Sequence, residues 1–242
     1  MIPKTIHYCW FGRGKLPFFT QKCMDSWERF LPEYEIRLWN ENTFNVYSIP
    51  YTCEAYQKRK YAFVADYVRL YALYKFGGIY MDTDVEILKS LNDLLHLPGF
   101  VGYEHEQFIN TGIIACEPNN EWAKEQLEWY EGKHFIKSNG KSDMTSNVQI
   151  ISSVMKSNGF YNGNCLQIYK DCMYVFPKDY FCPKSRSGII TITDNTYCIH
   201  HYAASWVPWH LKAKKILFQN ILGPKITDIL VRTKRSLLKK IS

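Results

Sequence analysis

Hydrophobic and polar residues recur with a helical period over residues 60–76. Apolar side chains stand every three or four positions there: Tyr61, Val64, Val68, Tyr71 and Tyr74. This spacing predicts a helix with one apolar stripe. Gly77 and Gly78 follow the basic Lys75, and a glycine at that place predicts the helix end, because glycine adopts the left-handed conformation at little cost. Residues 79–81 are apolar and predict a short buried strand.

Similar short segments fill the rest of the chain. Strands are predicted over residues 2–10, 34–39, 85–88, 100–103 and 108–115. Helices are predicted over residues 20–30, 90–95, 120–130 and 147–158, with short strands and turns over 160–200, including 175–177 and 188–192. An opening order of strand, helix, strand, helix, strand is typical of an α/β domain with a mostly parallel sheet flanked by helices. Ligands of such sheets bind beyond the carboxyl ends of the strands.

Two carboxylates stand where the predicted strand 79–81 ends. Asp82 and Asp84 can face the same way, because side chains alternate along an extended chain. Adjacent carboxylates repel each other, and a divalent cation such as Mg²⁺ or Mn²⁺ relieves that repulsion with oxygen ligands. Asp66 and Arg69 share one face of the preceding helix and can point at the same place. The alternative is a pair of solvated turn residues beside an ordinary helix ion pair.

The residues around this pair resemble glycosyltransferase family 32. The match runs Ala65-Asp66-x-x-Arg69-Leu70 and then Gly77-Gly78-Ile79-Tyr80-x-Asp82-x-Asp84. It is also similar to the catalytic domain of the large clostridial glucosylating toxins. Two further motifs fit the family: I-H-x-x-W-F-G over residues 6–12 and H-x(3)-S-W over residues 201–206. The resemblance implies a GT-A-like fold and a retaining transferase. Its donor would be a nucleotide diphosphate sugar with UDP expected, its sugar a hexose or N-acetylhexosamine, and its acceptor a capsule or lipopolysaccharide glycan.

The resemblance also implies roles for single residues. Asp82 and Asp84 would hold Mn²⁺ or Mg²⁺ with His201 as a third ligand, and Asp66 and Arg69 would grip the donor sugar. Contacts with the nucleotide sugar fall on Trp10, Phe11, Tyr80, Asn110, Ser205 and Trp206. His200 and His201 point opposite ways in a strand, so at most one reaches the cation. The alternative for His201 is a hydrogen-bonded residue that fixes its loop. Residues 142–145 depart from the Gly-Pro and Thr pattern of many family members, which puts the transfer of acceptor contacts in doubt.

Charge divides the chain into a body and a tail. The net charge is +7, but residues 212–242 hold nine Lys or Arg and one acid, so the tail carries +8 and the rest −1. We therefore predict a transferase domain over 1–211 that binds no nucleic acid, and a basic amphipathic helical tail over 212–242. Such a tail is typical of peripheral contact with an anionic membrane, although it could also pack on the domain. Eight cysteines without CxxC spacing, and an N-terminus unlike a signal peptide, indicate a cytoplasmic protein, peripheral on the inner face of the plasma membrane.

Three other functions use the same residues differently. A metal-dependent phosphodiesterase or nuclease would gather Asp66, Asp82, Asp84 and Glu86 around two ions. A retaining glycosidase would need two facing carboxylates and no metal. A lectin-like or membrane-binding module would need no catalysis. Because the chain has neither a G-x-G-x-x-G loop nor a P-loop, phosphate binding would depend on the cation.

Overall fold

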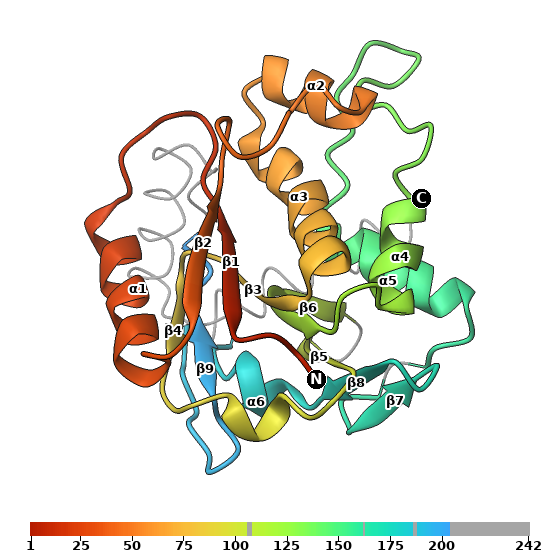
Figure 1. Cartoon of the computed structure of the whole chain (residues 1–242). Coiled ribbons are helices and arrows are strands. Elements are labelled where there is room, and N and C mark those ends of the chain that lie inside the picture. The colour runs from red at the N-terminus through yellow and green to blue at the C-terminus, as the bar shows by residue number, and fades with distance from the viewer. Residues whose placement is uncertain (106–107, 162, 186–187, 204–242) are drawn as a thin grey trace, which may run out of the picture. The chain divides into compact units, whose positions relative to one another are not determined.

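The computed structural model describes residues 1–105, 108–161, 163–185 and 188–203 (Figure 1). The chain divides into two compact units, one of residues 1–183 with 192–201 and one of residues 184–191 with 202–242. All the elements named below belong to the first unit. Ser205, Trp206 and the predicted tail over 212–242 lie outside the described residues.

The helices and strands follow one another in mixed order. The strands are β1 (Thr5–Cys9), β2 (Glu35–Trp39), β3 (Gly78–Met81), β4 (Val85–Ile87), β5 (Gly99–His105), β6 (Phe108–Cys116), β7 (Gln167–Tyr169), β8 (Met173–Phe176) and β9 (Cys198–His200). The helices are α1 (Phe18–Phe30), α2 (Pro50–Gln57), α3 (Tyr61–Phe76), the 3₁₀ turn η1 (Asn92–Leu94), α4 (Glu121–Glu128), α5 (Asn147–Ser157) and α6 (Lys178–Phe181). Most predicted elements are confirmed, but α2 was not predicted, and residues 188–192 form only one bridge, Lys184 to Ile190.

The central sheet has seven strands in the order β2-β1-β3-β6-β5-β8-β7. The pairs β1–β2, β1–β3 and β5–β8 are parallel, and the pairs β3–β6, β5–β6 and β7–β8 are antiparallel. The predicted α/β class with flanking helices is confirmed. The sheet is mixed, however, and the prediction of a mostly parallel sheet is wrong, because β6 returns against β3 and β5 returns against β6.

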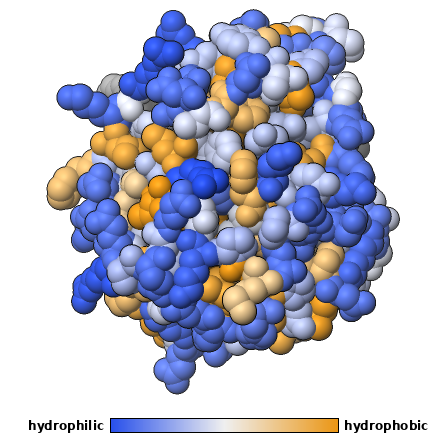
Figure 2. All heavy atoms as spheres, viewed as in Figure 1, coloured by the Kyte–Doolittle hydropathy of each residue, from blue (hydrophilic) through white to orange (hydrophobic). Residues whose placement is uncertain are grey.

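Both faces of the sheet are covered, which explains the uninterrupted apolar sequence of β3. Tyr80 belongs to one hydrophobic cluster together with Val64 and Val68 of α3, whereas Ile79 and Met81 belong to a second cluster with Trp27 of α1. A strand buried on both sides reads as a continuous apolar run. Figure 1 shows α3, α4 and α5 on one side of β3 and β6, and α1 with β4 and β9 on the other. The face in Figure 2 is largely hydrophilic, with apolar side chains scattered among polar ones.

The turn after α3 sets the position of β3. Gly77 has φ +64°, and its backbone N–H donates to Leu73 O at 2.8 Å, which ends the helix as predicted. Gly78 has φ +97°, and an added Cβ would lie 2.5 Å from Thr5 O of β1. The turn therefore requires glycine at 78 for β3 to enter the sheet beside β1.

Three strand ends meet at one edge of this sheet. Because β2, β1 and β3 are neighbours and parallel, their carboxyl ends, at Trp39, Cys9 and Met81, lie together. The chain leaves β3 through residues 82–84 and enters β4, which pairs antiparallel with β9. No helix among the described residues combines the length and the apolar character needed to span a bilayer.

Candidate active site

The turn between β3 and β4 carries the two aspartates. The backbone N–H of Asp82 donates to Gly112 O of β6 at 2.8 Å, and the N–H of Val85 donates back to Asp82 O at 3.0 Å. Tyr80 is buried, and its hydroxyl donates to Asp82 Oδ1 at 2.8 Å. Asp84 is buried and its carbonyl accepts from His201 N at 3.1 Å. Backbone hydrogen bonds to β6 and β9 thus fix the turn that carries both carboxylates.

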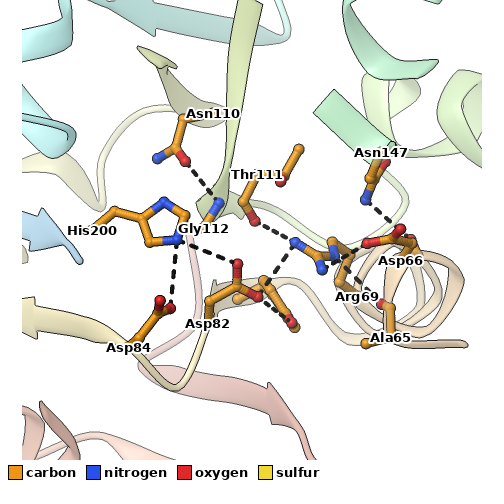
Figure 3. Close-up of polar contacts among 11 residues, drawn as sticks. Ala65, Asp66, Arg69, Asp82, Asp84, Asn110, Thr111, Gly112, Asn147 and His200 are labelled. Atoms are coloured by element: carbon orange, nitrogen blue, oxygen red, sulfur yellow. Dashed lines mark hydrogen bonds and ion pairs between the residues drawn. The ribbon is translucent and has the colours of Figure 1, made fainter. Parts of the chain in front are cut away.

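Arg69 connects this turn to α3 (Figure 3). Its Nη2 donates to Asp66 Oδ1 at 2.9 Å, its Nη1 donates to Thr111 O at 2.5 Å, and Nη1 also lies 3.5 Å from Asp82 Oδ1. The guanidinium stacks over the Tyr80 ring, 4.6 Å from the centroid. Burial alone would lower the pKa of Arg69, but Asp82, Tyr80 and Asp66 more than offset it, so the side chain stays charged. One cation therefore links the helix carboxylate to the turn carboxylate.

Asp66 is the buried acid on the helix side of the site. Burial raises its pKa to about 6, while Arg69 opposes the rise and Asp82 adds to it. Its backbone carbonyl accepts a hydrogen bond from Asn147 Nδ2 at 3.4 Å. The pair with Arg69 is buried on both sides, with side-chain exposures of 11% and 6%. It is not the exposed helix ion pair of the alternative interpretation.

His200 stands on the other side of the aspartates, at the end of β9. Its Nε2 lies 3.4 Å from Asp84 Oδ1 and 3.8 Å from Asp82 Oδ2. Burial would lower the pKa of His200, but the adjacent Asp84 carboxylate raises it well above its ordinary value. Gly112 leaves room for the His200 ring, because a Cβ added at position 112 would lie 2.6 Å from His200 Nδ1.

The expectation for His201 is corrected by this arrangement. His201 Nε2 lies 2.7 Å from Glu86 Oε2, and its ring packs edge-on against Phe19 with centroids 5.0 Å apart. The two histidines diverge as predicted, but it is His200 that faces the aspartates. Asp82, Asp84 and His200 each offer one ligand atom within 4.8 Å of the others, which makes them a candidate site for a divalent cation.

The remaining predicted residues have mixed surroundings. Trp10 follows β1 directly, is half-buried, and its Nε1 donates to Gly14 O at 2.6 Å. Phe11 is buried in the hydrophobic cluster on the α3 side. Asn110 is fully buried on β6, where its Oδ1 accepts from Gly112 N at 2.8 Å while its Nδ2 has no partner among the described residues. The roles of Trp10, Phe11 and Asn110 toward a nucleotide sugar stay predictions.

The arrangement does not match a two-metal phosphodiesterase. Glu86 is turned toward His201, and Arg69 stands between Asp66 and Asp82. The four acids of that alternative therefore do not surround one position. Sequence reasoning missed the contributions of His200, Thr111 and Gly112. Strand alternation could have indicated His200, because it shows that one of the two histidines faces the aspartates. Thr111 acts through its backbone and Gly112 through the absence of a side chain, so their residue types gave no signal.

The sequence of the chain is similar to those of known glycosyltransferases. Residues 17–100 match the family described as a glycosyltransferase sugar-binding region containing a DXD motif. An uncharacterized glycosyltransferase of Acanthamoeba polyphaga mimivirus is 30% identical over 240 residues, covering 91% of this chain and 89% of that protein. Inositol phosphoceramide mannosyltransferase 3 of Schizosaccharomyces pombe is 35% identical over 118 residues, covering 47% of this chain but 33% of the relative.

Among solved structures, the PaToxG glycosyltransferase aligns with a TM-score of 0.48 at 17% identity, covering 65% of this chain and 70% of that one. The sequence relationship carries the assignment, because the viral relative is matched over nearly its whole length and the motif match spans the Asp66 to Asp84 region. The chain therefore belongs to the DXD-containing glycosyltransferases.

Proposed function

We propose that this glycosyltransferase is metal-dependent and transfers a hexose or N-acetylhexosamine from a nucleotide diphosphate sugar with retention of the anomeric configuration. The observation that carries the proposal is the cluster of Asp82, Asp84 and His200, whose ligand atoms lie within 4.8 Å of one another at the carboxyl end of β3. Ligands of α/β sheets bind at such ends.

The chemistry of this donor set fits Mn²⁺ or Mg²⁺. Two carboxylates and one imidazole leave coordination positions open, and Mg²⁺ in particular usually fills such positions with water and substrate phosphates. The backbone around the site supports this fit, because only a residue without Cβ at position 112 leaves room for the His200 ring. A divalent cation bound here would neutralise the negative charge that develops on the departing nucleoside diphosphate.

The residues of α3 serve the donor sugar in this proposal. Asp66 and Arg69 are fixed by each other and by Thr111 O, so they can present hydrogen-bonding groups to sugar hydroxyls without reorganising. Asp66 is an acid with a pKa of about 6 and is therefore mainly ionised at neutral pH, where it accepts hydrogen bonds. The ion pair holds this carboxylate beside Asp82 at the site edge.

The sugar, the acceptor and the location are proposed from a relative's name, from the family resemblance and from the sequence. The name of the S. pombe relative supports hexose transfer, and UDP as the carrier follows from the family resemblance. A capsule or lipopolysaccharide acceptor follows from the resemblance alone. Peripheral membrane contact follows from the basic tail over 212–242, whose net charge of +8 would favour an anionic surface, and a cytoplasmic location follows from the eight cysteines without CxxC spacing.

Isothermal titration of UDP- and GDP-sugars, each with and without Mn²⁺, tests this function. We expect one donor to bind only when Mn²⁺ is present. Asp84→Asn and His200→Ala should each abolish or greatly weaken the Mn²⁺-dependent part. Asp25→Asn, a matched change on the exposed side of α1, should leave it intact. Metal-independent binding of the donor, or full Mn²⁺ dependence in Asp84→Asn, would contradict the proposal.

A further inference from the structure

Three consecutive bases stand where α2 passes into α3. Lys58, Arg59 and Lys60 are exposed, and within the described residues none of them forms an ion pair. The turn that carries them is fixed by the backbone, because Arg59 N donates to Tyr56 O at 2.9 Å and Lys60 N donates to Ala55 O at 2.8 Å. Three like charges therefore lie side by side on an ordered turn.

The backbone of Arg59 indicates that its side chain has a use. Arg59 adopts the left-handed conformation, with φ +55°, directly after the end of α2. Glycine or asparagine is the usual residue at such a helix end, because a larger side chain is disfavoured in this conformation. The chain thus keeps a positive charge here despite an unfavourable backbone conformation, and strain of this kind is found where a residue serves a function.

A second basic segment packs against α2. Residues 134–145 form a hairpin loop that reaches from α4 to α2 (Figure 1). Glu54 of α2 holds this loop with both carboxylate oxygens: Oε1 lies 2.6 Å from His134 Nδ1, and Oε2 accepts from Ile136 N at 2.8 Å. Because Glu54 lies one helical turn before Lys58, these contacts place the hairpin loop next to the three bases.

Together the two segments concentrate positive charge. Residues 54–60 and 134–145 hold five Lys or Arg and two acids, Glu54 and Asp143. Glu54 is engaged by the hairpin loop, and Asp143 Oδ1 lies 3.2 Å from Lys137 Nζ. The chain over 1–211 carries a net charge of only −1, so this surface differs from the rest of the body. Its exposed bases are named the basic face: Lys58, Arg59, Lys60, Lys137 and Lys141.

The basic face lies on the active-site side of the sheet. Helix α3 ends at Gly77, next to the start of β3, whereas Arg69 in the middle of the helix contacts Asp82, just past the end of β3. The helix therefore runs antiparallel to the strand, and its residues before Arg69 extend beyond the strand end. Lys60 precedes Arg69 by nine residues, which is about 13.5 Å along the helix at about 1.5 Å per residue.

We infer that the basic face binds an anionic lipid bilayer, so that the active-site edge of the sheet faces the membrane. Charge complementarity is the main argument, because each basic group near an anionic membrane strengthens binding about fivefold. Met144 of the hairpin loop is 49% exposed and adds apolar surface beside the bases. The contact uses other residues than the basic tail over 212–242.

The contact has a consequence for the acceptor that rests on the proposed function, since it assumes a donor sugar at Asp66 and Arg69. A glycan linked to a lipid of that bilayer would have to extend about 13.5 Å from the headgroups to reach the sugar, as estimated from the helix rise. The membrane contact itself does not depend on the donor.

Neutralising the basic face tests the contact. The full chain and its triple variant Lys58→Gln, Arg59→Gln, Lys60→Gln would be co-sedimented with vesicles of phosphatidylcholine mixed with phosphatidylglycerol. We expect the triple variant to bind roughly 100-fold more weakly, at about fivefold for each charge removed. Hydrogen–deuterium exchange of the wild type should slow over residues 58–60 and 137–141 when these vesicles are added.

A second triple variant controls for net charge. Lys22→Gln, Arg29→Gln, Lys156→Gln removes two lysines and one arginine from exposed positions of α1 and α5, and it should bind the vesicles nearly as the wild type does. Equal losses in both triple variants would overturn the inference, because net charge alone would then account for binding. Equally tight binding of the wild type to pure phosphatidylcholine vesicles would overturn it as well.

Arg59→Asn separates vesicle binding from folding. Asparagine suits the left-handed conformation, so the melting temperature should not fall, while vesicle binding should weaken about fivefold. Unchanged vesicle binding in the triple variant at 58–60 would overturn the membrane contact, and so would loss of oligonucleotide binding alone, which would assign the face to nucleic acid. Mn²⁺-dependent donor binding should persist in all these variants. Its absence in the wild type would overturn the proposed function and leave the membrane contact in place.

Discussion

Gly112→Ala is the most direct perturbation of the candidate metal site, because it adds one methyl group and no charge. The new Cβ would meet three atoms of the His200 ring, at 2.6 Å from Nδ1, 2.8 Å from Cε1 and 3.0 Å from Cγ. Ordinary contact begins at 3.4 Å, so the ring must move by about 0.8 Å. Figure 3 shows the ring next to Gly112, with dashed lines from the ring to Asp84 and Asp82, so such a shift changes its distance to the carboxylates.

The magnitude follows from the packing. Inserting a methyl group into a well-packed interior costs about 1–3 kcal/mol. For a chain of this size we expect the melting temperature to fall by roughly 2–12 °C, at about 2–4 °C per kcal/mol. Misplacing one of three ligands should weaken Mn²⁺ binding by about 10–100-fold, as changes to the support of a metal ligand do. Gly14→Ala is the matched control, since an added Cβ there meets nothing within 4 Å.

A double-mutant cycle isolates the contact from other effects of the alanine. Chemical denaturation would give the free energy of unfolding of the wild type, Gly112→Ala, His200→Ala and the double variant. If the clash with the imidazole is the cause, Gly112→Ala should cost little when His200 is already alanine. An equal cost in both backgrounds would refute the idea that Gly112 is required to make room for His200.

Four further outcomes are expected. Burial of His7 lowers its pKa to about 4, and its Nε2 lies 2.8 Å from Gly77 O. Between pH 6.5 and about pH 4, the unfolded chain therefore binds a proton at this residue that the folded chain does not bind. This should remove about 3 kcal/mol of stability as the pH falls through that window, and melting curves of His7→Gln should show a smaller slope there. Arg69→Lys keeps the charge but cannot contact Asp66 and Thr111 O together, so we expect at least a tenfold lower transfer rate with Mn²⁺ affinity nearly unchanged. A wild-type rate would argue against a role for these two simultaneous contacts. EDTA should abolish transfer and added Mn²⁺ should restore it, whereas activity that survives chelation would exclude metal dependence. Deletion of residues 224–242 should reduce co-sedimentation with anionic liposomes, and unchanged sedimentation would remove the membrane role of the tail.

The helix and turn before β3 could be predicted because their signals are local. Apolar residues at helical spacing, then Gly77, then an apolar run, describe α3, its end and β3 almost to the residue. Asp82 and Asp84 were found for the same reason, since they break an apolar run at its end. The helix face of Asp66 and Arg69 points at the strand end, as predicted, and Arg69 is the group that joins Asp66 to Asp82.

Strand direction could not be predicted in this way. A fully buried strand such as β6 has the same apolar run whether its neighbour is parallel or antiparallel, so the mixed sheet remained hidden. The choice between His200 and His201 was hidden too. Alternation shows that the two rings diverge, but which one faces Asp84 depends on the register between β9 and β4, in which Val85 opposes His200.

Three consecutive positions of β6 serve the site in three different ways. Asn110 contributes a side chain, Thr111 a carbonyl oxygen, and Gly112 an empty space. Mutational freedom along this tripeptide should therefore be uneven. A saturation library is expected to accept valine, serine or alanine at 111, whose backbone alone contacts the guanidinium, and to reject nearly every change at 112 and most changes at 110, whose side chain accepts from Gly112 N. Position 111 is therefore the position of the three at which substitutions can accumulate without loss of activity.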